Sequence, residues 1–227
     1  MAIEFASSAY VQNGVNALPT GDVDVSLAAW VKITSQVFSV IFGYGDGTTT
    51  RASPILYIVN ATTISFGLWA DDVTYVSGNI AGAWHHWLGT FRASDNLESV
   101  YLDGVLRNTK VAGGNGVFSA ARCRTGANPS AAPGNFYTGQ VQDGRILNRL
   151  LGPTEALILA SGYRGPLGGE VGWWRYDDFR GITSPDGAVL ATANLVPDLS
   201  GNENDGTPTT SPVARALDAA RLGVGPR

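Results

Sequence analysis

The segment that decides the class of fold, residues 84–107, reads WHHWLGTFRASDNLESVYLDGVLR. An aromatic-rich run predicts a first strand over Trp84–Arg92, and a polar loop separates it from a second strand over Leu97–Leu102. An Asp-Gly pair at 103–104 then leads into a third strand, Val105–Lys110. Asp-Gly between apolar runs is typical of a β-hairpin, because a type I′ turn needs positive φ at both central residues. The segment therefore predicts antiparallel sheet.

The rest of the chain repeats this pattern of short strands and polar turns, and its 29 glycines in 227 residues suit many turns. Two short helices are expected, over Pro153–Ser161 and Val213–Leu222, the first with Pro153 and Glu155 near its start and Gly162 at its end. A turn is expected at Asp71-Asp72. Further strands are expected over Ala2–Phe5, Ala9–Gln12, Val23–Ile33, Val37–Tyr44, Ile55–Val59, Thr63–Trp69, Val73–Val76, Ala121–Gly126 and Val171–Asp178, with two more inside Asn135–Leu147. Regularly spaced strands of this kind predict an all-β sandwich or jelly roll.

Four parts of the chain resemble, in the right order, motifs of the laminin-G-like, concanavalin A-like jelly-roll domains. They are Ala2–Gln12 with Val25–Ile33 (VSLAAWVKI), Ala83–Phe91, Val100–Leu106 and Asn135–Glu155. The resemblance implies an antiparallel β-sandwich over residues 2–161. Gly144 departs from an apolar position of the last motif, so we expect a bulge there.

The C-terminal part resembles the segment that usually opens such a domain, through Val171–Asp178 and Asp198–Thr207. We expect one domain over 1–227, with 1–162 as the main body and 163–227 as an extension. The extension either folds back beside Ala2–Phe5 in its own chain or completes a neighbouring subunit. We favour the first arrangement, because it buries the tryptophans at 173 and 174 without a partner.

Composition and charge exclude several classes of protein. A net charge of −4 with no basic run argues against nucleic acid. No apolar run approaches the ~20 residues of a membrane helix, and the first twenty residues show no signal peptide, so we expect a protein that is not exported by that route. The single cysteine, Cys123, cannot form an intrachain disulfide, and we expect it to be buried and inert.

No residue is assigned a catalytic or cofactor-binding role. The only histidines, His85 and His86, are strand neighbours that point to opposite faces, so they cannot readily share a metal. Glycosidases generally use two carboxylates beside the scissile bond. We cannot nominate such a pair from the five glutamates, of which Glu203, in the run Glu203-Asn204-Asp205, lies in a turn. We therefore expect no enzyme.

Calcium is an alternative for the polar turns, because hard cations bind clustered oxygen ligands. The candidates are Asp198, Asn202, Asn204 and Asp205, with Asp46, Asp71 and Asp72 as weaker ones. We expect these residues to serve as turn formers instead, so no metal site is assigned. Most of the six tryptophans are expected in the core, and Trp69, beside Asp71-Asp72, is the candidate for ligand stacking.

Three functions compete. The first is a non-catalytic virion component of a bacteriophage, a capsid decoration or tail-associated protein that forms a homo-oligomer and docks on other virion proteins. This reading draws on the recurrence of the fold in phage particles, an associational argument. The second is a carbohydrate-binding, lectin-like module with glycan ligands. The third, an enzyme, is the least favoured.

Overall fold

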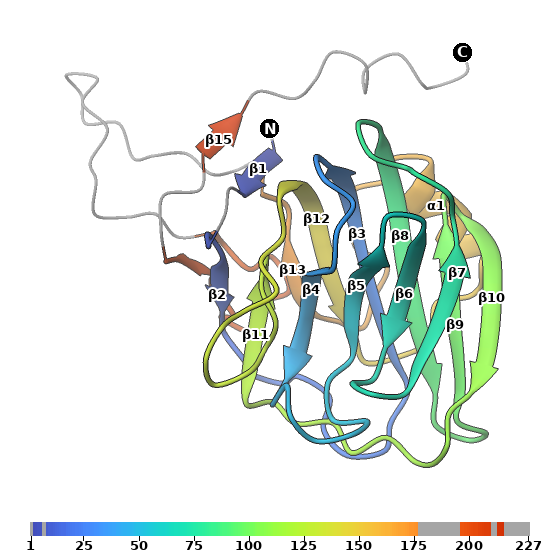
Figure 1. Cartoon of the computed structure of the whole chain (residues 1–227). Coiled ribbons are helices and arrows are strands. Elements are labelled where there is room, and N and C mark those ends of the chain that lie inside the picture. Colours follow the sequence, from blue (N-terminus) through green and yellow to red (C-terminus); the bar gives the residue numbers. More distant parts are fainter. Residues whose placement is uncertain (1, 6–7, 177–195, 210–212, 216–227) are drawn as a thin grey trace.

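Two antiparallel β-sheets stack face to face and form a sandwich (Figure 1). The computed structural model describes residues 2–5, 8–176, 196–209 and 213–215. All the ladders between its named strands are antiparallel, as the hairpin in residues 84–107 predicts. The all-β sandwich prediction is therefore confirmed.

The two sheets are built from strands that are distant in sequence. Across the eight-stranded sheet the order is β10 (Val105–Val111), β9 (Leu97–Leu102), β8 (Trp84–Arg92), β3 (Val25–Ile33), β12 (Gly139–Leu147), β1 (Ala2–Phe5) and β15 (Val213–Arg215), and β13 (Glu170–Trp174) also pairs with β12. Across the seven-stranded sheet the order is β14 (Thr207–Pro208), β2 (Val11–Asn13), β11 (Arg122–Thr125), β4 (Ser39–Gly45), β5 (Ile55–Asn60), β6 (Thr63–Gly67) and β7 (Asp72–Val76).

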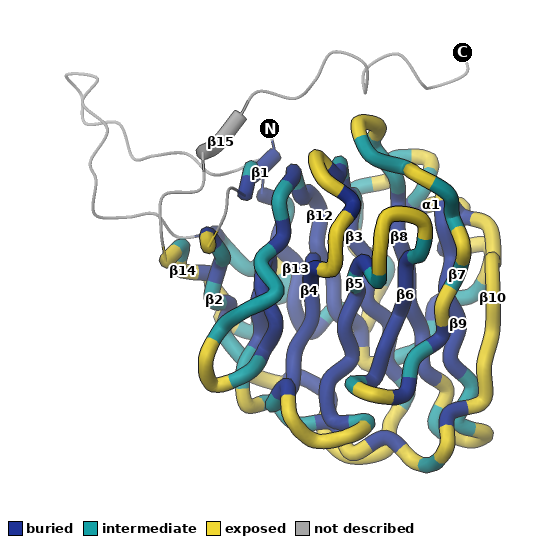
Figure 2. The backbone as a smooth tube through the Cα atoms, viewed as in Figure 1, coloured by how far each residue is buried: buried dark blue, intermediate teal, exposed yellow. Residues whose placement is uncertain are grey.

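The core lies between the sheets and is filled largely by alternate residues of the central strands. In β3 these are Val25, Leu27, Ala29 and Val31, all fully buried, as the period-two pattern predicts. Figure 2 shows the central strands as a continuous buried layer, with exposure confined to loops and outer strands. Val23, which the sequence pattern also placed on the core face, precedes β3 and is exposed.

The hairpin at Asp103-Gly104 has the predicted geometry. Its central residues have φ values of +54° and +77°, as a type I′ turn requires. The turn connects β9 and β10, whose Leu102 and Val105 face each other in the ladder. Predicted and observed bounds agree exactly for β8 and β9 and within one residue for β10.

The one helix of the described residues, α1 (Pro153–Ala160), covers the outer face of the eight-stranded sheet. Glu155 accepts a hydrogen bond from the Gly152 N–H (3.1 Å) and satisfies a donor at the helix start. The buried side of α1 joins a second apolar cluster, which explains why Ala28, an outward residue of β3, is also buried. Its members are Ala28, Leu88, Tyr101, Leu147, Leu151, Ala156 and Leu159.

The prediction of a second helix over Val213–Leu222 is wrong for those of its residues that the structure describes. Residues 213–215 form β15, which pairs with β1 through Ala2↔Arg215 and Glu4↔Val213. The free backbone edge of β1 offers these residues hydrogen-bonding partners that outweigh the helical propensity of an alanine-rich segment. Residues 216–222 lie outside the described part of the chain.

A single bulged strand, β12, replaces the two strands predicted within Asn135–Leu147. The pairing of β12 with β3 shifts register between Gln142 and Arg145, and Asp143 adopts a φ of +55°. The bulge predicted at Gly144 is thus confirmed. A bulge re-aims the side chains around it, and here it directs two charged groups to the same place.

These two groups, Asp143 and Arg145, form a fully buried ion pair. The Arg145 guanidinium donates to both carboxylate oxygens of Asp143 (3.2 and 3.0 Å), contacts Glu170 (3.3 Å) and lies over the Trp173 ring (4.3 Å). The Trp173 indole N–H also donates to Asp143 (2.7 Å). A buried charge needs such partners, so the network fixes β13 against β12.

The C-terminal segment completes the free edge of β12 in its own chain. β1 pairs with β12 at residues 139–141 and β13 pairs with it at residues 144–147, so the two strands follow one another along the same edge. Trp174 of β13 lies in the core against Phe42 (ring centroids 5.7 Å apart). The single-domain organisation and the alternative of exchange with a neighbouring copy both stay predictions.

One carboxyl lies inside the sandwich. Glu98 of β9 is fully buried, and both its oxygens lack a hydrogen-bond partner among the described residues. Burial raises the pKa of Glu98 to about 8. Lys110, which lies opposite Glu98 in the ladder, opposes this shift, whereas Asp71 and Asp72 reinforce it. The native state therefore favours the neutral acid.

Replacing Trp174 by alanine tests whether the extension belongs to the same folding unit. We expect Trp174→Ala to lower the free energy of unfolding by about 3–5 kcal/mol, because it opens a cavity between the sheets. Urea unfolding should still show one transition. Two separate transitions, with the main body as stable as in the wild type, would contradict this. Trp84→Ala, at a half-buried indole, is the control and should cost less.

Glu98→Gln tests the buried carboxyl. The native pKa of about 8 exceeds the unfolded value of about 4.5, so the native state keeps a proton that the unfolded chain loses between these pH values. Wild-type stability, relative to Glu98→Gln, should therefore fall by on the order of a few kcal/mol as the pH rises from 4.5 to 8. Chemical denaturation across this range measures the difference, and parallel profiles would refute the argument.

Candidate functional site

An aromatic pocket of about 280 Å³ lies on the seven-stranded sheet. We call it the aromatic pocket. Its lining is Phe38, Val40, Ile55, Tyr57, Trp69, Ala70, Asp72 and Asn135. These residues come from the start of β4, from β5, from the β6–β7 turn and from the loop before β12, so four separate parts of the chain meet here.

The alternation of the strands aims this lining away from the core. In β5, Leu56 and Ile58 belong to the core, so Ile55 and Tyr57 point to the outer face of the sheet. A register shift in β4 between Val40 and Phe42 brings Val40 to the same face. These apolar side chains point outward because their neighbours in sequence are packed into the core.

The turn that presents Trp69 is strained. Trp69 and its neighbour Ala70 have φ values of +71° and +61°, and the turn closes through a hydrogen bond from the Leu68 N–H to the Asp71 carbonyl (3.1 Å). Bulky residues rarely occupy this left-handed region, which costs of order 1–3 kcal/mol per residue. The turn thus holds the Trp69 side chain in a defined position at the end of the sheet.

This turn corrects two sequence predictions. The predicted strand Thr63–Trp69 ends at Gly67, and the turn falls on Trp69-Ala70, not on Asp71-Asp72. Asp72 instead begins β7 and faces Gly67 in the ladder. Trp-Ala lacks the Asn or Gly that marks a type I′ turn, so its sequence carries no signal for one.

Three polar side chains complete the pocket. The Tyr57 hydroxyl donates to Asp72 Oδ2 (2.9 Å), and burial raises the pKa of the Asp72 carboxyl above its usual value. The Asn135 backbone carbonyl accepts from the Val40 N–H (2.8 Å), which holds the loop against β4. Within the described chain the Asn135 side-chain amide makes no hydrogen bond, so its donors and acceptor are open to a ligand.

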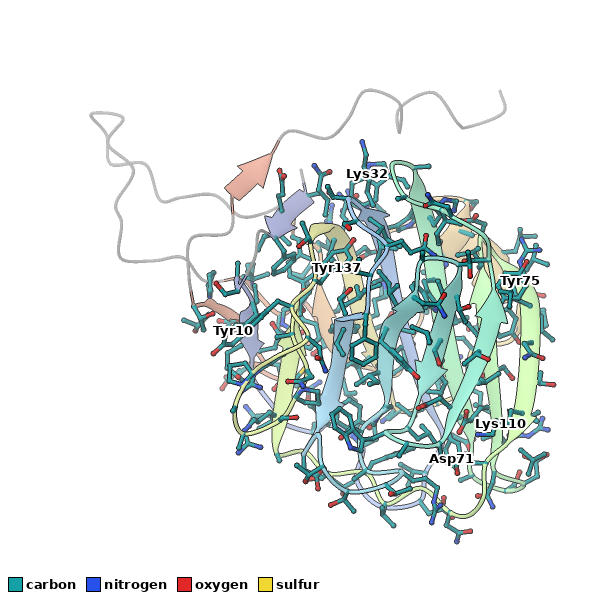
Figure 3. All side chains as sticks on the ribbon, in the orientation of Figure 1. Tyr10, Lys32, Asp71, Tyr75, Lys110 and Tyr137 are labelled. Atoms are coloured by element: carbon teal, nitrogen blue, oxygen red, sulfur yellow. The ribbon has the colours of Figure 1, made fainter. Side chains whose placement is uncertain are left out.

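Next to the pocket, Asp71 joins the β6–β7 turn to the loop after β10. It accepts from the Lys110 ammonium and the Gly113 N–H (2.7 Å), and Arg51 lies 3.6 Å away (Figure 3 labels Asp71 and Lys110). Burial alone would raise its pKa, but the Lys110 and Gly113 hydrogen bonds lower it. Asp71 is thus surrounded by cations and donors, which is unlike a calcium ligand.

The other calcium candidates near the C-terminus hold the loop at 198–205 together. Asp198 accepts from the Trp173 and Ser200 N–H groups (2.8 and 2.9 Å) and from the Asn204 N–H (3.0 Å). Asn204 is fully buried and donates to the Asn16 and Val171 carbonyls (2.7 and 2.8 Å). These contacts use the polar atoms to tie β13 to the loop after β2.

Two further calcium candidates in this loop, Asn202 and Asp205, make similar contacts. Asn202 donates to the Ser200 hydroxyl (3.1 Å), and Asp205 accepts from the Asp198 N–H (2.8 Å). Asp46 shapes a separate turn, where one oxygen accepts from the Thr48 and Thr49 N–H groups (both 2.9 Å). Within the described residues, no group of three or more His, Cys, Asp or Glu is arranged to hold a metal.

The reactive residue types lie apart from the aromatic pocket. His85 contacts Asp103 (2.8 Å), whereas His86 packs edge-on against Trp30 (ring centroids 5.5 Å apart). Cys123 is fully buried, as predicted, and burial raises its thiol pKa to about 12. Asp72 is the one carboxylate in the pocket lining, so the pocket lacks the two that a glycosidase generally needs.

The tryptophans divide into two groups. Trp87 and Trp174 lie in the core and Trp173 is buried in the Arg145 network, whereas Trp30, Trp69 and Trp84 are half-buried. Of the six tryptophans, only Trp69 lines the pocket, and its predicted role in ligand stacking stays a prediction.

Sequence reasoning missed the pocket residues Phe38, Tyr57 and Asn135. Tyr57 had a usable signal, since it sits between two core positions of a strand and must face outward. Asn135 had none, because its place depends on a long-range contact with β4.

Structural comparison finds similar sandwiches among carbohydrate-related proteins. A Bacteroides ovatus protein provisionally described as carbohydrate binding has a TM-score of 0.69 at 13% identity over 94% of this chain, and the chain spans 61% of it. A CBM40 of a Ruminococcus gnavus sialidase, bound to α2,3 sialyllactose, has a TM-score of 0.55 at 12% identity, covering 70% of this chain and 96% of the other. Identities this low establish the fold alone.

A third structure is domain 4 of AbnA, an extracellular arabinanase from Geobacillus stearothermophilus, in complex with arabinotriose. Its TM-score is 0.54 at 17% identity, covering 70% of this chain and 76% of that domain. No curated protein matches the chain in sequence. Across the described residues, no helix has the length and apolar character to span a membrane.

A family model settles the relationship in sequence. The model of the concanavalin A-like lectin/glucanases superfamily matches residues 5–156, about two thirds of the chain and nearly the range over which the motifs were recognised. The antiparallel β-sandwich agrees with that match. The chain belongs to the concanavalin A-like lectin/glucanases superfamily.

Proposed function

We propose that this protein is a carbohydrate-binding module and that the aromatic pocket is its glycan site. The observation that carries the proposal is the strained Trp69-Ala70 turn, which presents an indole beside Tyr57 and Phe38. Aromatic faces pack well on the C–H faces of sugar rings, and a few placed polar groups then orient the hydroxyls. The pocket supplies such groups in Tyr57, Asp72 and Asn135.

The structural neighbours support the same reading. One is described provisionally as carbohydrate binding, and two are domains solved with bound oligosaccharides. The pocket's single carboxylate suits binding better than hydrolysis. Glycan binding, the alternative in the sequence analysis, therefore replaces the virion component as the preferred function.

The remaining sequence predictions about context stay predictions. They are a place in a virion, docking on capsid or tail proteins, and a homo-oligomer. No contact among the described residues favours them, and the comparisons name no virion protein among the structures cited above.

Trp69→Ala tests the proposed site. Removing the indole takes away most of the stacking surface, so binding to any glycan that the wild type recognises should weaken at least about tenfold. Isothermal titration calorimetry or ligand-observed NMR measures the change.

The matched control is Trp30→Ala, which removes an equally half-buried indole from the outer face of the other sheet. It should leave the affinity unchanged. Equal loss in both variants, or no loss in Trp69→Ala, would place the binding site elsewhere.

A further inference from the structure

The aromatic pocket carries one potential negative charge and no positive one. Asp72 is the only carboxylic acid among its eight lining residues, and none of them is Lys, Arg or His. Lys110 and Arg51, which pair with the neighbouring Asp71, do not line the pocket. The lining itself therefore offers a ligand one carboxylate and no cation, while Lys110, outside the lining, favours the ionised form of Asp72.

We propose, building on the glycan site above, that the pocket selects neutral sugars and rejects acidic ones, with Asp72 as the residue that determines this specificity. Sialic acids, uronic acids and sulfated sugars carry a carboxylate or sulfate that needs a cationic partner when it loses water. Here it would meet Asp72 instead. A neutral sugar needs only hydrogen-bond partners and an aromatic face.

The geometry around Asp72 supports this role. Oδ2 accepts from the Tyr57 hydroxyl (2.9 Å) and keeps lone pairs for a sugar hydroxyl, while Oδ1 is buried. The carboxylate lies directly over Gly67, where any Cβ would collide with Oδ1. The absence of a side chain at Gly67 thus lets Asp72 sit beside Tyr57 at the pocket wall.

The size of the pocket limits the part of a glycan that it holds. Its volume of about 280 Å³ lies just below the ~300–1,000 Å³ of pockets that enclose drug-sized ligands. We infer that it accommodates one sugar unit, with the rest of the glycan outside. The proposed preference for neutral over acidic sugars then applies to that one unit.

A glycan array that carries neutral and acidic sugars tests the proposal on the wild-type protein. The expected result is binding confined to neutral glycans and lost in Trp69→Ala. Binding to acidic glycans that also depends on Trp69 would overturn this inference and leave the glycan site intact. Binding to no glycan, or binding that ignores Trp69, would overturn the proposed site itself, and this inference with it.

A charge variant gives a second readout. Asp72→Asn keeps the shape and removes the charge, so the ratio of acidic to neutral glycan binding should rise by about tenfold. Asp46→Asn removes the same charge from a turn at the other end of β4 and should leave the ratio unchanged. An equal ratio in Asp72→Asn and the wild type would overturn the role of Asp72. Should Asp72→Asn fail to fold, the wild-type array still decides the charge preference.

Discussion

The structure depends on the packing of alternate residues of two sheets into one core. Each residue buried between the sheets forces its neighbours in the strand to face outward. In β5 the burial of Leu56 and Ile58 leaves Tyr57 on the surface, where it meets Trp69 and Asp72. The strand residues of the aromatic pocket are therefore placed by the packing of the core.

The same core also needs the C-terminal segment. β1 covers only the first part of β12, and β13 covers the rest, with Trp174 filling the core and Trp173 shielding the Arg145–Asp143 pair. The bulge in β12 makes this possible, because it brings Asp143 and Arg145 into one buried network. The C-terminal segment thus covers the part of the β12 edge that β1 leaves open.

Local patterns predicted the strands, the hairpin and the helix near residue 153. Their signals are apolar alternation, an Asp-Gly turn, and a proline at the start and a glycine after the end of the helix, and each of these lies within a short stretch of sequence. The predictions failed where contacts between residues far apart in sequence determine the local structure. Residues 213–215 pair with β1, and the Trp69-Ala70 turn is imposed by the β6–β7 pairing despite its composition. Among the residues of the aromatic pocket, the sequence singled out Trp69, because it lies beside a predicted turn. Phe38 and Asn135 were not singled out, because β4 and the loop before β12 meet only in the folded chain.

The most direct test of the central claim is to map backbone amide chemical shifts while a glycan that the protein binds is added. The account predicts that the largest changes cluster at Phe38, Tyr57, Trp69, Asp72 and Asn135, five residues brought together only by the fold. Changes centred on the outer face of the eight-stranded sheet, or on α1, would contradict it.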